Sequence, residues 1–198
     1  MFFTKGRQAC DKGPLTEHEY ELLQKARQLI PSNPPNPWGN RRIISAAGAI
    51  AGGWTKNEHY VLISSSGYSL NNPLTGERIE RNRDSGQTLE SLSEDSLHFT
   101  LPSSNETVSI YGLDAGDGIR VSPDGWLIER IAPWWPREAF MIKNVYVPHA
   151  AKKGYLDDAA VLDIPRLDGW MRAGFSPSGK YLAVLGSGGA VLFTNGDK

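Results

Sequence analysis

The 198-residue sequence has almost no cysteine, no long hydrophobic run and no excess of charge of one sign. Cys10 is its only cysteine, which excludes a disulfide within the chain and is typical of a protein made for a reducing compartment. The apolar stretch 43–53 is about half the length of a membrane-spanning helix, and the first residues lack the apolar core of a secretion signal. Lys and Arg number 21 against 22 Asp and Glu, so the molecule as a whole attracts neither nucleic acid nor a membrane surface. We therefore expect a soluble, cytoplasmic protein.

Recognisable catalytic and metal-binding motifs are also missing. None of the four His residues has a second His at ligand spacing, and there is no Gly-x-Ser-x-Gly or Walker motif. The segment 114–118 resembles the start of a calcium loop but lacks the later bidentate Glu, which favours a simple turn. The neighbouring carboxylates of Glu94 and Asp95 would point to opposite faces of a strand. The sequence thus predicts no catalytic residue, no metal ligand and no cofactor.

The chain is instead rich in turn-forming and aromatic residues, with 21 Gly, 13 Pro and 6 Trp. One pattern occurs twice, at 121–131 (VSPDGWLIERI) and at 175–185 (FSPSGKYLAVL). Pro fixes φ at the first central position of a turn, and Gly supplies the permissive position after it. The apolar residues that follow are of the types that strands favour. Each copy therefore predicts the end of one strand, a tight turn and the start of another strand.

A single helix is predicted near the N-terminus, over residues 15–30. Thr16 and Glu19 have the spacing of a capping box, and Leu15 and Tyr20 that of a hydrophobic staple. A proline-rich extended connector follows at 31–40. Apolar or alternating runs then predict strands, which are expected at residues 43–53, 60–63, 68–70, 78–80, 97–101, 107–111, 140–142, 145–147, 160–164 and 190–194.

These elements predict a mainly β fold of antiparallel meanders, arranged as blade-like stacked sheets or a partial, irregular propeller, with one N-terminal α-helix. Residues 1–40 form a helix and proline-rich arm, and residues 41–198 a single antiparallel β domain. The twice-used turn with its following strand, together with segment 62–79, resembles the inner-strand region of WD-repeat and related β-propeller blades. The resemblance implies strand–turn–strand geometry in three patches, which begin near residues 60, 121 and 175, and a surface that binds other proteins.

Two features are candidates for partner binding. Residues 84–118 contain no Lys or Arg but carry the carboxylates of Asp84, Glu90, Glu94, Asp95, Glu106, Asp114 and Asp117. Such a stretch is either a solvated face or an acidic surface that holds a basic partner. The second feature is Trp134-Trp135, held between two prolines, since an exposed Trp is a common binding anchor. Packing in the core or against a loop is the alternative for this pair, and Tyr68 is a further candidate anchor.

Three functions are compatible with these features. The first is a non-enzymatic protein-binding module, similar in type to small bacterial immunity proteins, which neutralise a basic, nuclease-type toxin. The acidic residues would steer the partner, and Tyr68, Trp134 or Trp135 would anchor it. The second is a hydrolase or carbohydrate-binding β domain in which Trp134 and Trp135 stack on a sugar. The third is a propeller-like scaffold that assembles through an unpaired sheet edge. A monomer or weak dimer is expected.

Overall fold

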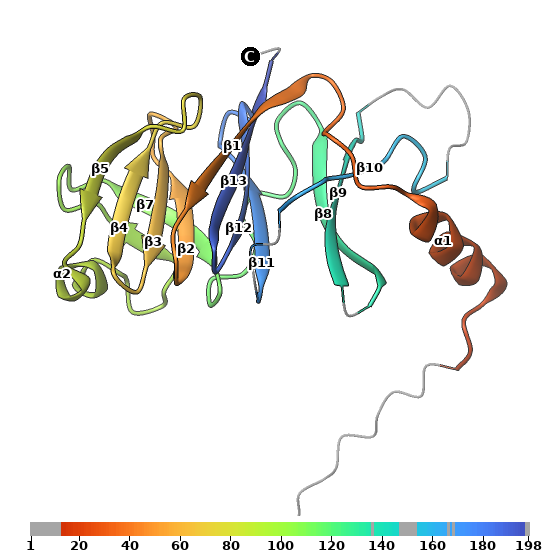
Figure 1. The fold of residues 1–198 in the computed structure, drawn as a ribbon, viewed down its shortest axis with the longest axis horizontal. Coiled ribbons are helices and arrows are strands. Elements are labelled where there is room, and N and C mark those ends of the chain that lie inside the picture. The colour runs from red at the N-terminus through yellow and green to blue at the C-terminus, as the bar shows by residue number, and fades with distance from the viewer. Residues whose placement is uncertain (1–12, 136, 147–153, 166, 168, 197–198) are drawn as a thin grey trace, which may run out of the picture.

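The computed structural model of the chain describes residues 13–135, 137–146, 154–165, 167 and 169–196. Within these residues the chain is mainly β with one helix near the N-terminus, as the sequence predicts, and it has a second short helix that the sequence analysis did not predict (Figure 1). The elements in chain order are α1 (Glu17–Gln28), β1 (Trp38–Ser45), β2 (Ala49–Trp54), β3 (Tyr60–Ser64), β4 (Gly67–Asn71), β5 (Arg78–Asn82), α2 (Ser85–Glu90), β6 (His98–Thr100), β7 (Thr107–Gly112), β8 (Trp126–Trp134), β9 (Arg137–Asn144), β10 (Ala160–Val161), β11 (Met171–Phe175), β12 (Tyr181–Gly186) and β13 (Gly189–Asn195).

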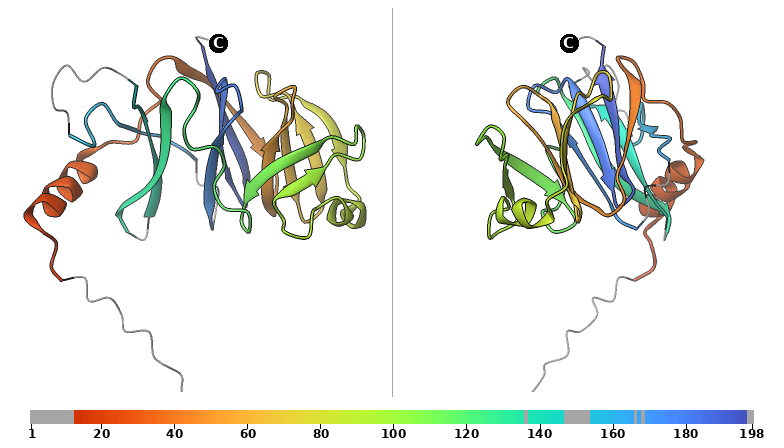
Figure 2. Two further views of the ribbon diagram at one scale, coloured as in Figure 1. Left: turned by 180° about the vertical axis from the view of Figure 1, so that it is seen from behind. Right: turned by 60° about the vertical axis from the view of Figure 1, so that its left-hand side comes forward.

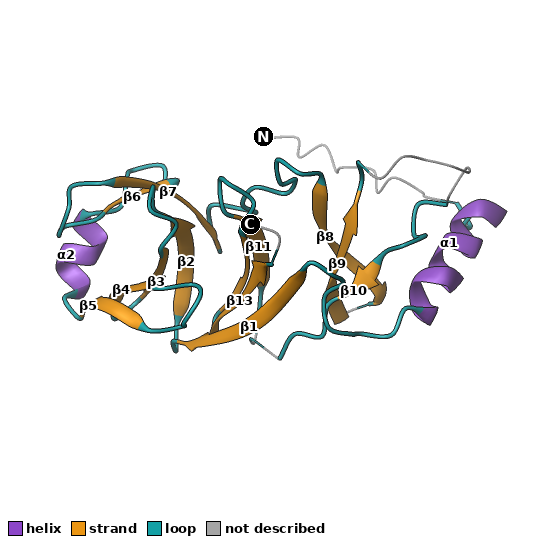
Figure 3. Cartoon of the chain, turned by 90° about the horizontal axis from the view of Figure 1, so that it is seen from above, coloured by secondary structure: helices purple, strands orange, loops and turns teal. Residues whose placement is uncertain are grey.

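The strands form three antiparallel sheets that stand in a row (Figure 3). A six-stranded sheet with the order β5-β4-β3-β2-β7-β6 curls at one end of the molecule, next to α2. The central sheet has the order β1-β13-β12-β11, and the third sheet has the order β10-β9-β8. Helix α1 lies beyond the third sheet, so α1 and α2 mark opposite ends of the row (Figure 2).

The central sheet pairs the first strand of the fold with the last. β1 pairs with β13, with Trp38 opposite Asn195 and Ser45 opposite Gly189. The predicted boundary at residue 40 therefore falls inside a strand. Trp38 is buried, and its ring meets that of Trp126 edge-on at 6.1 Å. The proline-rich connector thus ends in the hydrophobic core.

The central sheet is covered on both faces. Leu182 and Val184 of β12 pack into the core shared with the third sheet, whereas Ala183 and Leu185 pack into the core shared with the six-stranded sheet. A strand buried on both sides needs apolar residues at every position, which explains the uninterrupted apolar run of β12. A third core fills the inside of the six-stranded sheet, around Phe99.

Residues 43–53 contain the end of one strand and the start of another, which belong to different sheets, so the prediction of one buried strand is wrong. β1 ends at Ser45, and β2 begins at Ala49. Gly48 lies between them with φ +67°, in the left-handed region that favours glycine. Small apolar residues on both sides of this turn concealed it, because they lack the polar residues that usually mark turns.

Helix α1 begins and ends as its sequence predicts, within two residues. The capping box is present: Glu19 N–H donates to Thr16 Oγ1 at 3.3 Å, and Thr16 N–H donates to Glu19 Oε2 at 2.8 Å. The helix lies against β8, where Arg27 Nε donates to the carbonyl of Pro133 at 3.0 Å. Neither helix in the described ranges has the length and apolar composition needed to cross a membrane.

In both predicted Ser-Pro-x-Gly turns the serine accepts two backbone hydrogen bonds, although the second turn is one residue longer than the first. Ser122 accepts through Oγ from Trp126 N–H at 2.9 Å, and its carbonyl accepts from Gly125 N–H at 2.9 Å. Ser176 does the same with Tyr181 N–H at 3.1 Å and Gly179 N–H at 2.9 Å. The glycine has positive φ in both turns. The turn at 176–179 is therefore confirmed as the connection from β11 to β12, whereas the turn at 122–125 leads into β8 from a loop in which Ile119 and Val121 form isolated β-bridges.

A third turn of this geometry connects β2 to β3. Thr55 accepts through Oγ1 from His59 N–H at 3.0 Å, and its carbonyl accepts from Glu58 N–H at 2.9 Å. Glu58 takes the glycine position, with φ +59°. A turn of this kind thus leads into one strand of each sheet: β3, β8 and β12.

The three turns touch one another in a row. Ser178 N–H donates to Glu58 Oε1 at 3.1 Å, and a Cβ at Gly179 would lie 2.9 Å from Ser122 Cβ. Asn195 Nδ2, at the end of β13, donates to Asp124 Oδ2 at 3.1 Å. The three turns therefore lie on the side of the molecule where β13 ends (Figure 1). The resemblance to propeller blades stays a prediction, since an open row of three sheets does not by itself define that family.

Candidate functional site: a cleft between two sheets

A cleft of about 1140 Å³ opens between the third sheet and the central sheet. One wall is formed by Arg130, Trp134 and Glu138 of the β8–β9 hairpin, and the other by Trp170 with the first residues of β11. Residues 162–165 close the cleft where the chain crosses from β10 towards β11. We call this the intersheet cleft.

The cleft exists because the core between the two sheets ends before the strands do. Ile128 and Phe140 still pack against the central sheet, but the next inward positions toward the hairpin tip are Arg130 and Glu138. These side chains pair with each other, Arg130 Nη1 lying 3.4 Å from Glu138 Oε2. Charged side chains resist burial between sheets, so the sheets separate here and leave an open space.

The described side chains give the intersheet cleft an excess of positive charge. Asp163 pairs with Arg41 at 3.9 Å, and Glu138 pairs with Arg130. Arg137 and Arg172 line the cleft as well, and neither forms an ion pair with a described residue. Two guanidinium groups are therefore available to a ligand with carboxylate or phosphate groups.

Tryptophan side chains surround these arginines. Trp134 and Trp170 line opposite walls of the cleft, and the Arg172 guanidinium lies 6.0 Å from the ring centroid of Trp170. Trp135 follows in the turn between β8 and β9 and is 83% exposed. The predicted Trp134-Trp135 anchor is therefore divided: Trp134 belongs to the cleft wall, whereas Trp135 is exposed in the turn that follows.

The seven predicted acidic residues do not form one cluster. Asp84 caps α2, Glu90 ends it, and Glu94 and Asp95 lie in the following loop; we call these four residues the acidic end. Glu106 and Asp117 instead line a smaller groove of about 490 Å³ that also contains Lys56. Asp114 lies in the loop after β7.

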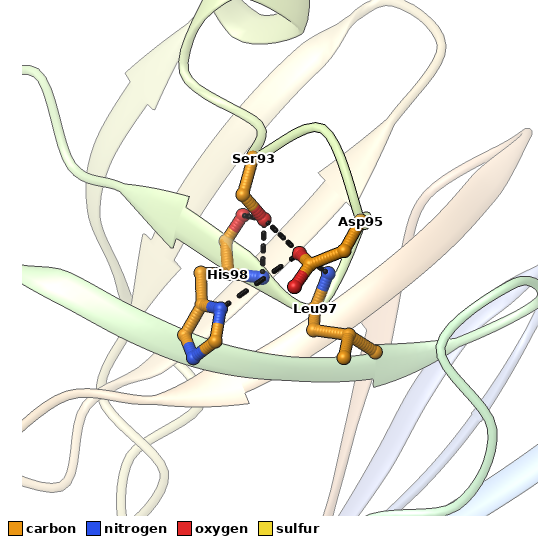
Figure 4. Close-up of polar contacts among 4 residues, drawn as sticks. All are labelled: Ser93, Asp95, Leu97 and His98. Atoms are coloured by element: carbon orange, nitrogen blue, oxygen red, sulfur yellow. Dashed lines mark hydrogen bonds and ion pairs between the residues drawn. The ribbon is translucent and has the colours of Figure 1, made fainter.

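Several of these carboxylates hold their own loops. Asp95 Oδ1 accepts from Ser93 Oγ at 2.6 Å and from Leu97 N–H at 3.0 Å, and it lies 3.9 Å from His98 Nδ1 (Figure 4). The hydrogen bond from Ser93 is the main cause that lowers the pKa of Asp95. Asp84 similarly accepts from Gln87 N–H at 3.0 Å.

Glu106 also accepts from the backbone, since Lys56 N–H donates to its Oε1 at 2.6 Å. Glu90 and Glu94, by contrast, are exposed, and no ion pair joins them to a described residue. These two carboxylates are the part of the acidic end that is available to a partner.

A basic strand adjoins the acidic end. β5 carries Arg78 and Arg81, and Arg83 follows it directly. The nearby charges of Arg83, and to a lesser degree Arg78, lower the pKa of Arg81. Since Asn82 Nδ2 donates to Gln87 Oε1 of α2 at 2.6 Å, the acidic and basic segments meet. The absence of Lys and Arg within 84–118 therefore does not give this end of the molecule a uniformly acidic surface.

Tyr68 belongs to the interior. It is 3% exposed, its ring packs edge-on against Phe99, and its hydroxyl donates to Glu80 Oε1 at 2.5 Å. This placement removes Tyr68 from the residues that a partner can touch in the folded chain. Trp134 and Trp135 are the two predicted aromatic anchors that the structure keeps accessible.

Sequence reasoning missed Arg130, Arg137, Arg172 and Trp170 as site residues. They come from β8, β9 and the start of β11, and they meet only because the third sheet stacks on the central one. No local spacing encodes that contact. In the part of the chain that is described, no group of three or more His, Cys, Asp and Glu side chains could hold a metal ion.

Comparisons of the chain with models of protein families, with curated proteins and with solved structures gave no match. The function is therefore inferred from the geometry and chemistry of the site.

Proposed function

We propose that this chain is a non-enzymatic protein-binding module whose main contact surface is the intersheet cleft together with the exposed Trp135. The observation that carries the proposal is the combination of two guanidinium groups that form no ion pair with a described residue, Arg137 and Arg172, with tryptophans around one open cleft. Trp and Arg are the residue types most enriched among those that dominate protein–protein binding energy.

The exposed indole of Trp135 supports this proposal. A Trp side chain that is 83% exposed leaves a large apolar surface in water, which a partner would cover on binding. Residues of this kind at the centre of an interface contribute about 2 kcal/mol or more when they are truncated to Ala. Trp134, one residue earlier, is already half-buried and would need little rearrangement to contact the same partner.

Alanine substitutions at the two tryptophans test the proposal. The full chain and its Trp134→Ala and Trp135→Ala variants are used to capture a partner from the native cytosol, and the captured proteins are compared. The matched control is Tyr146→Ala, because Tyr146 is a 64% exposed aromatic that lies against Gly125 at the other end of the same sheet. We expect loss of the partner with the tryptophan variants alone. Equal capture by all three folded variants would overturn the proposal.

A second candidate is the bacterial immunity protein that neutralises a basic, nuclease-type toxin in the cytoplasm. It is favoured by the exposed carboxylates of Glu90 and Glu94. Electrostatic steering by these groups would make the association rate fall as salt rises. The test is stopped-flow association with a toxin encoded beside this chain, since an immunity protein is usually encoded next to its toxin. A rate that does not change with salt would remove this candidate.

A carbohydrate ligand is a third candidate, because Trp134 and Trp170 on the cleft walls could stack on sugar rings. A glycan array with the wild-type chain and Trp170→Ala distinguishes this candidate from protein binding. Turnover of a sugar or ester substrate that a single carboxylate substitution abolishes would instead indicate a hydrolase.

A further inference from the structure

Among the described residues, one edge of β9 has no strand partner where it borders the intersheet cleft. β10 is only two residues long and pairs with Ile142 and Met141, and Leu162 N–H then donates to the carbonyl of Phe140 at 2.8 Å. Beyond this point the chain turns away, since Asp163 N–H donates to the carbonyl of Ser32 at 2.8 Å. β9 continues for three more residues, 137–139, which pair with β8 on the other side.

The alternation of backbone groups along β9 shows which N–H and C=O groups point toward this edge. Alternate residues of an antiparallel strand direct both N–H and C=O to the same neighbour. Phe140 faces β10, so Glu138 presents its N–H and C=O on the same side, past the end of β10. Glu138 and its neighbours line the intersheet cleft, so the unpaired edge opens into that space.

Resting on the proposed function, we infer that the intersheet cleft binds an extended acidic peptide segment of the partner, which adds to the third sheet as a strand beside residues 137–139. Peptides often bind by adding a strand to a sheet edge, where backbone hydrogen bonds give affinity and side-chain contacts give specificity. Here the charges select the peptide: Arg137 and Arg172 line the cleft, and neither forms an ion pair with a described residue.

The walls of the cleft suit alternating side chains. Successive residues of a bound strand point to opposite faces, so carboxylates could reach the arginines while the residues between them contact Phe140, Leu162 and Trp170. The preferred sequence is therefore one in which acidic and β-branched residues alternate.

The probe is a capped, fluorescently labelled peptide of alternating Val and Glu, about eight residues long, the length of an ordinary strand. Two control peptides are matched to it: one has Lys in place of Glu, and the other carries N-methyl groups on alternate amides, which removes hydrogen-bond donors but keeps the charge. Binding to the full chain is measured by fluorescence anisotropy. We expect the Val-Glu peptide to bind. Each control peptide should bind with an affinity at least about tenfold lower.

Two double variants locate the binding site. Arg137→Glu with Arg172→Glu reverses the cleft charges, and Arg78→Glu with Arg81→Glu makes the same change in net charge on β5. We expect the first double variant to lower the affinity for the Val-Glu peptide about tenfold or more. The second should leave that affinity within about twofold of the wild-type value. Hydrogen exchange at the Glu138 amide should slow when the peptide binds, because a bound strand would accept its hydrogen bond.

Equal binding of the N-methylated peptide, or an unchanged exchange rate at Glu138, would overturn strand addition. Absence of binding by the Val-Glu peptide would overturn the inference as a whole. Neither result bears on the capture of a native partner through Trp134 and Trp135, so the proposed function can stand or fall separately.

Discussion

The carboxylate of Glu58 accepts a hydrogen bond from the backbone N–H of Ser178 at 3.1 Å, across 120 positions of sequence. This bond joins the turn of the six-stranded sheet to the turn of the central sheet. On the other side of the same turn, Gly179 lies against Ser122 of the third sheet. The three turns therefore link the three sheets to one another.

Gly179→Ala should destabilise the chain by about 2–4 kcal/mol. A Cβ at this position would lie 2.9 Å from Pro123 Cδ and from Ser122 Cβ, in addition to the strain of φ +72°. Left-handed backbone alone costs an alanine about 1–2 kcal/mol, and overpacking adds about 1–3 kcal/mol. The free energy of unfolding from urea denaturation measures the effect.

Gly116→Ala is the matched control for that substitution. Gly116 has φ +76°, but a Cβ there would meet no atom within 4 Å. It should therefore lose only the backbone contribution, about 1–2 kcal/mol. Equal losses at Gly116 and Gly179 would show that the close packing of the turns contributes nothing to stability.

The hydroxyl of Thr55 should matter more than its methyl group. Thr55→Ser keeps the acceptor for His59 N–H, whereas Thr55→Val replaces it with a methyl group of similar size. We expect Thr55→Val to cost about 1–2 kcal/mol of unfolding free energy and Thr55→Ser clearly less, because the partly buried N–H of His59 would lose its partner in the valine variant. A valine variant as stable as the serine variant would show that this third turn does not depend on the hydroxyl bond.

The contrast between the three turns shows where sequence patterns succeed. Both Ser-Pro-x-Gly turns could be predicted, because their proline restricts φ and their glycine permits a positive φ. These residues are Pro123 and Gly125 in the first turn and Pro177 and Gly179 in the second. The turn at Thr55 has the same hydrogen bonds but uses Lys56 and Glu58, and residue types that fit many conformations carry no such signal.

Stability should fall in alkaline solution as buried tyrosines titrate. Burial raises the pKa of Tyr60, whose hydroxyl is 3.1 Å from that of Tyr111, and burial followed by the hydrogen bond to Glu80 raises the pKa of Tyr68 to about 12. The folded chain thus binds these protons more tightly than the unfolded chain. The stabilisation is complete below about pH 10 and is lost as pH rises toward the folded pKa values, by at most about 1.4 kcal/mol per pH unit for each tyrosine.

Tyr60→Phe tests this dependence by removing one titrating group. The variant should be less stable near neutral pH, because Tyr111 loses a hydrogen-bond partner in the core, but its stability should fall less steeply above about pH 10. Unfolding free energies measured across this pH range give the slope. An equal slope in both proteins would contradict the assignment of the alkaline loss to this pair.

Less of the candidate site than of the fold could be predicted from the sequence. The exposure of Trp135 could be predicted, because prolines on both sides of the Trp134-Trp135 pair hinder its burial, although Trp134 is half-buried. The rest of the cleft depends on pairing between β1 and β13 and on the stacking of β8 against β11, contacts that join distant parts of the chain. The acidic stretch shows that composition along the sequence does not predict the charge of a surface. Residues 84–118 contain no Lys or Arg, but Arg78, Arg81 and Arg83 lie beside them because β5 and α2 meet.

The measurement that tests the central claim most directly compares two charge-reversed chains for capture of the native partner. One carries Arg137→Glu and Arg172→Glu in the intersheet cleft, and the other carries Glu90→Lys and Glu94→Lys at the acidic end. All four residues are on the surface or in the open cleft, so thermal unfolding should confirm that both variants fold. If the cleft is the binding site, the cleft variant loses the partner and the acidic-end variant keeps it. Retention by the cleft variant together with loss by the acidic-end variant would contradict this account.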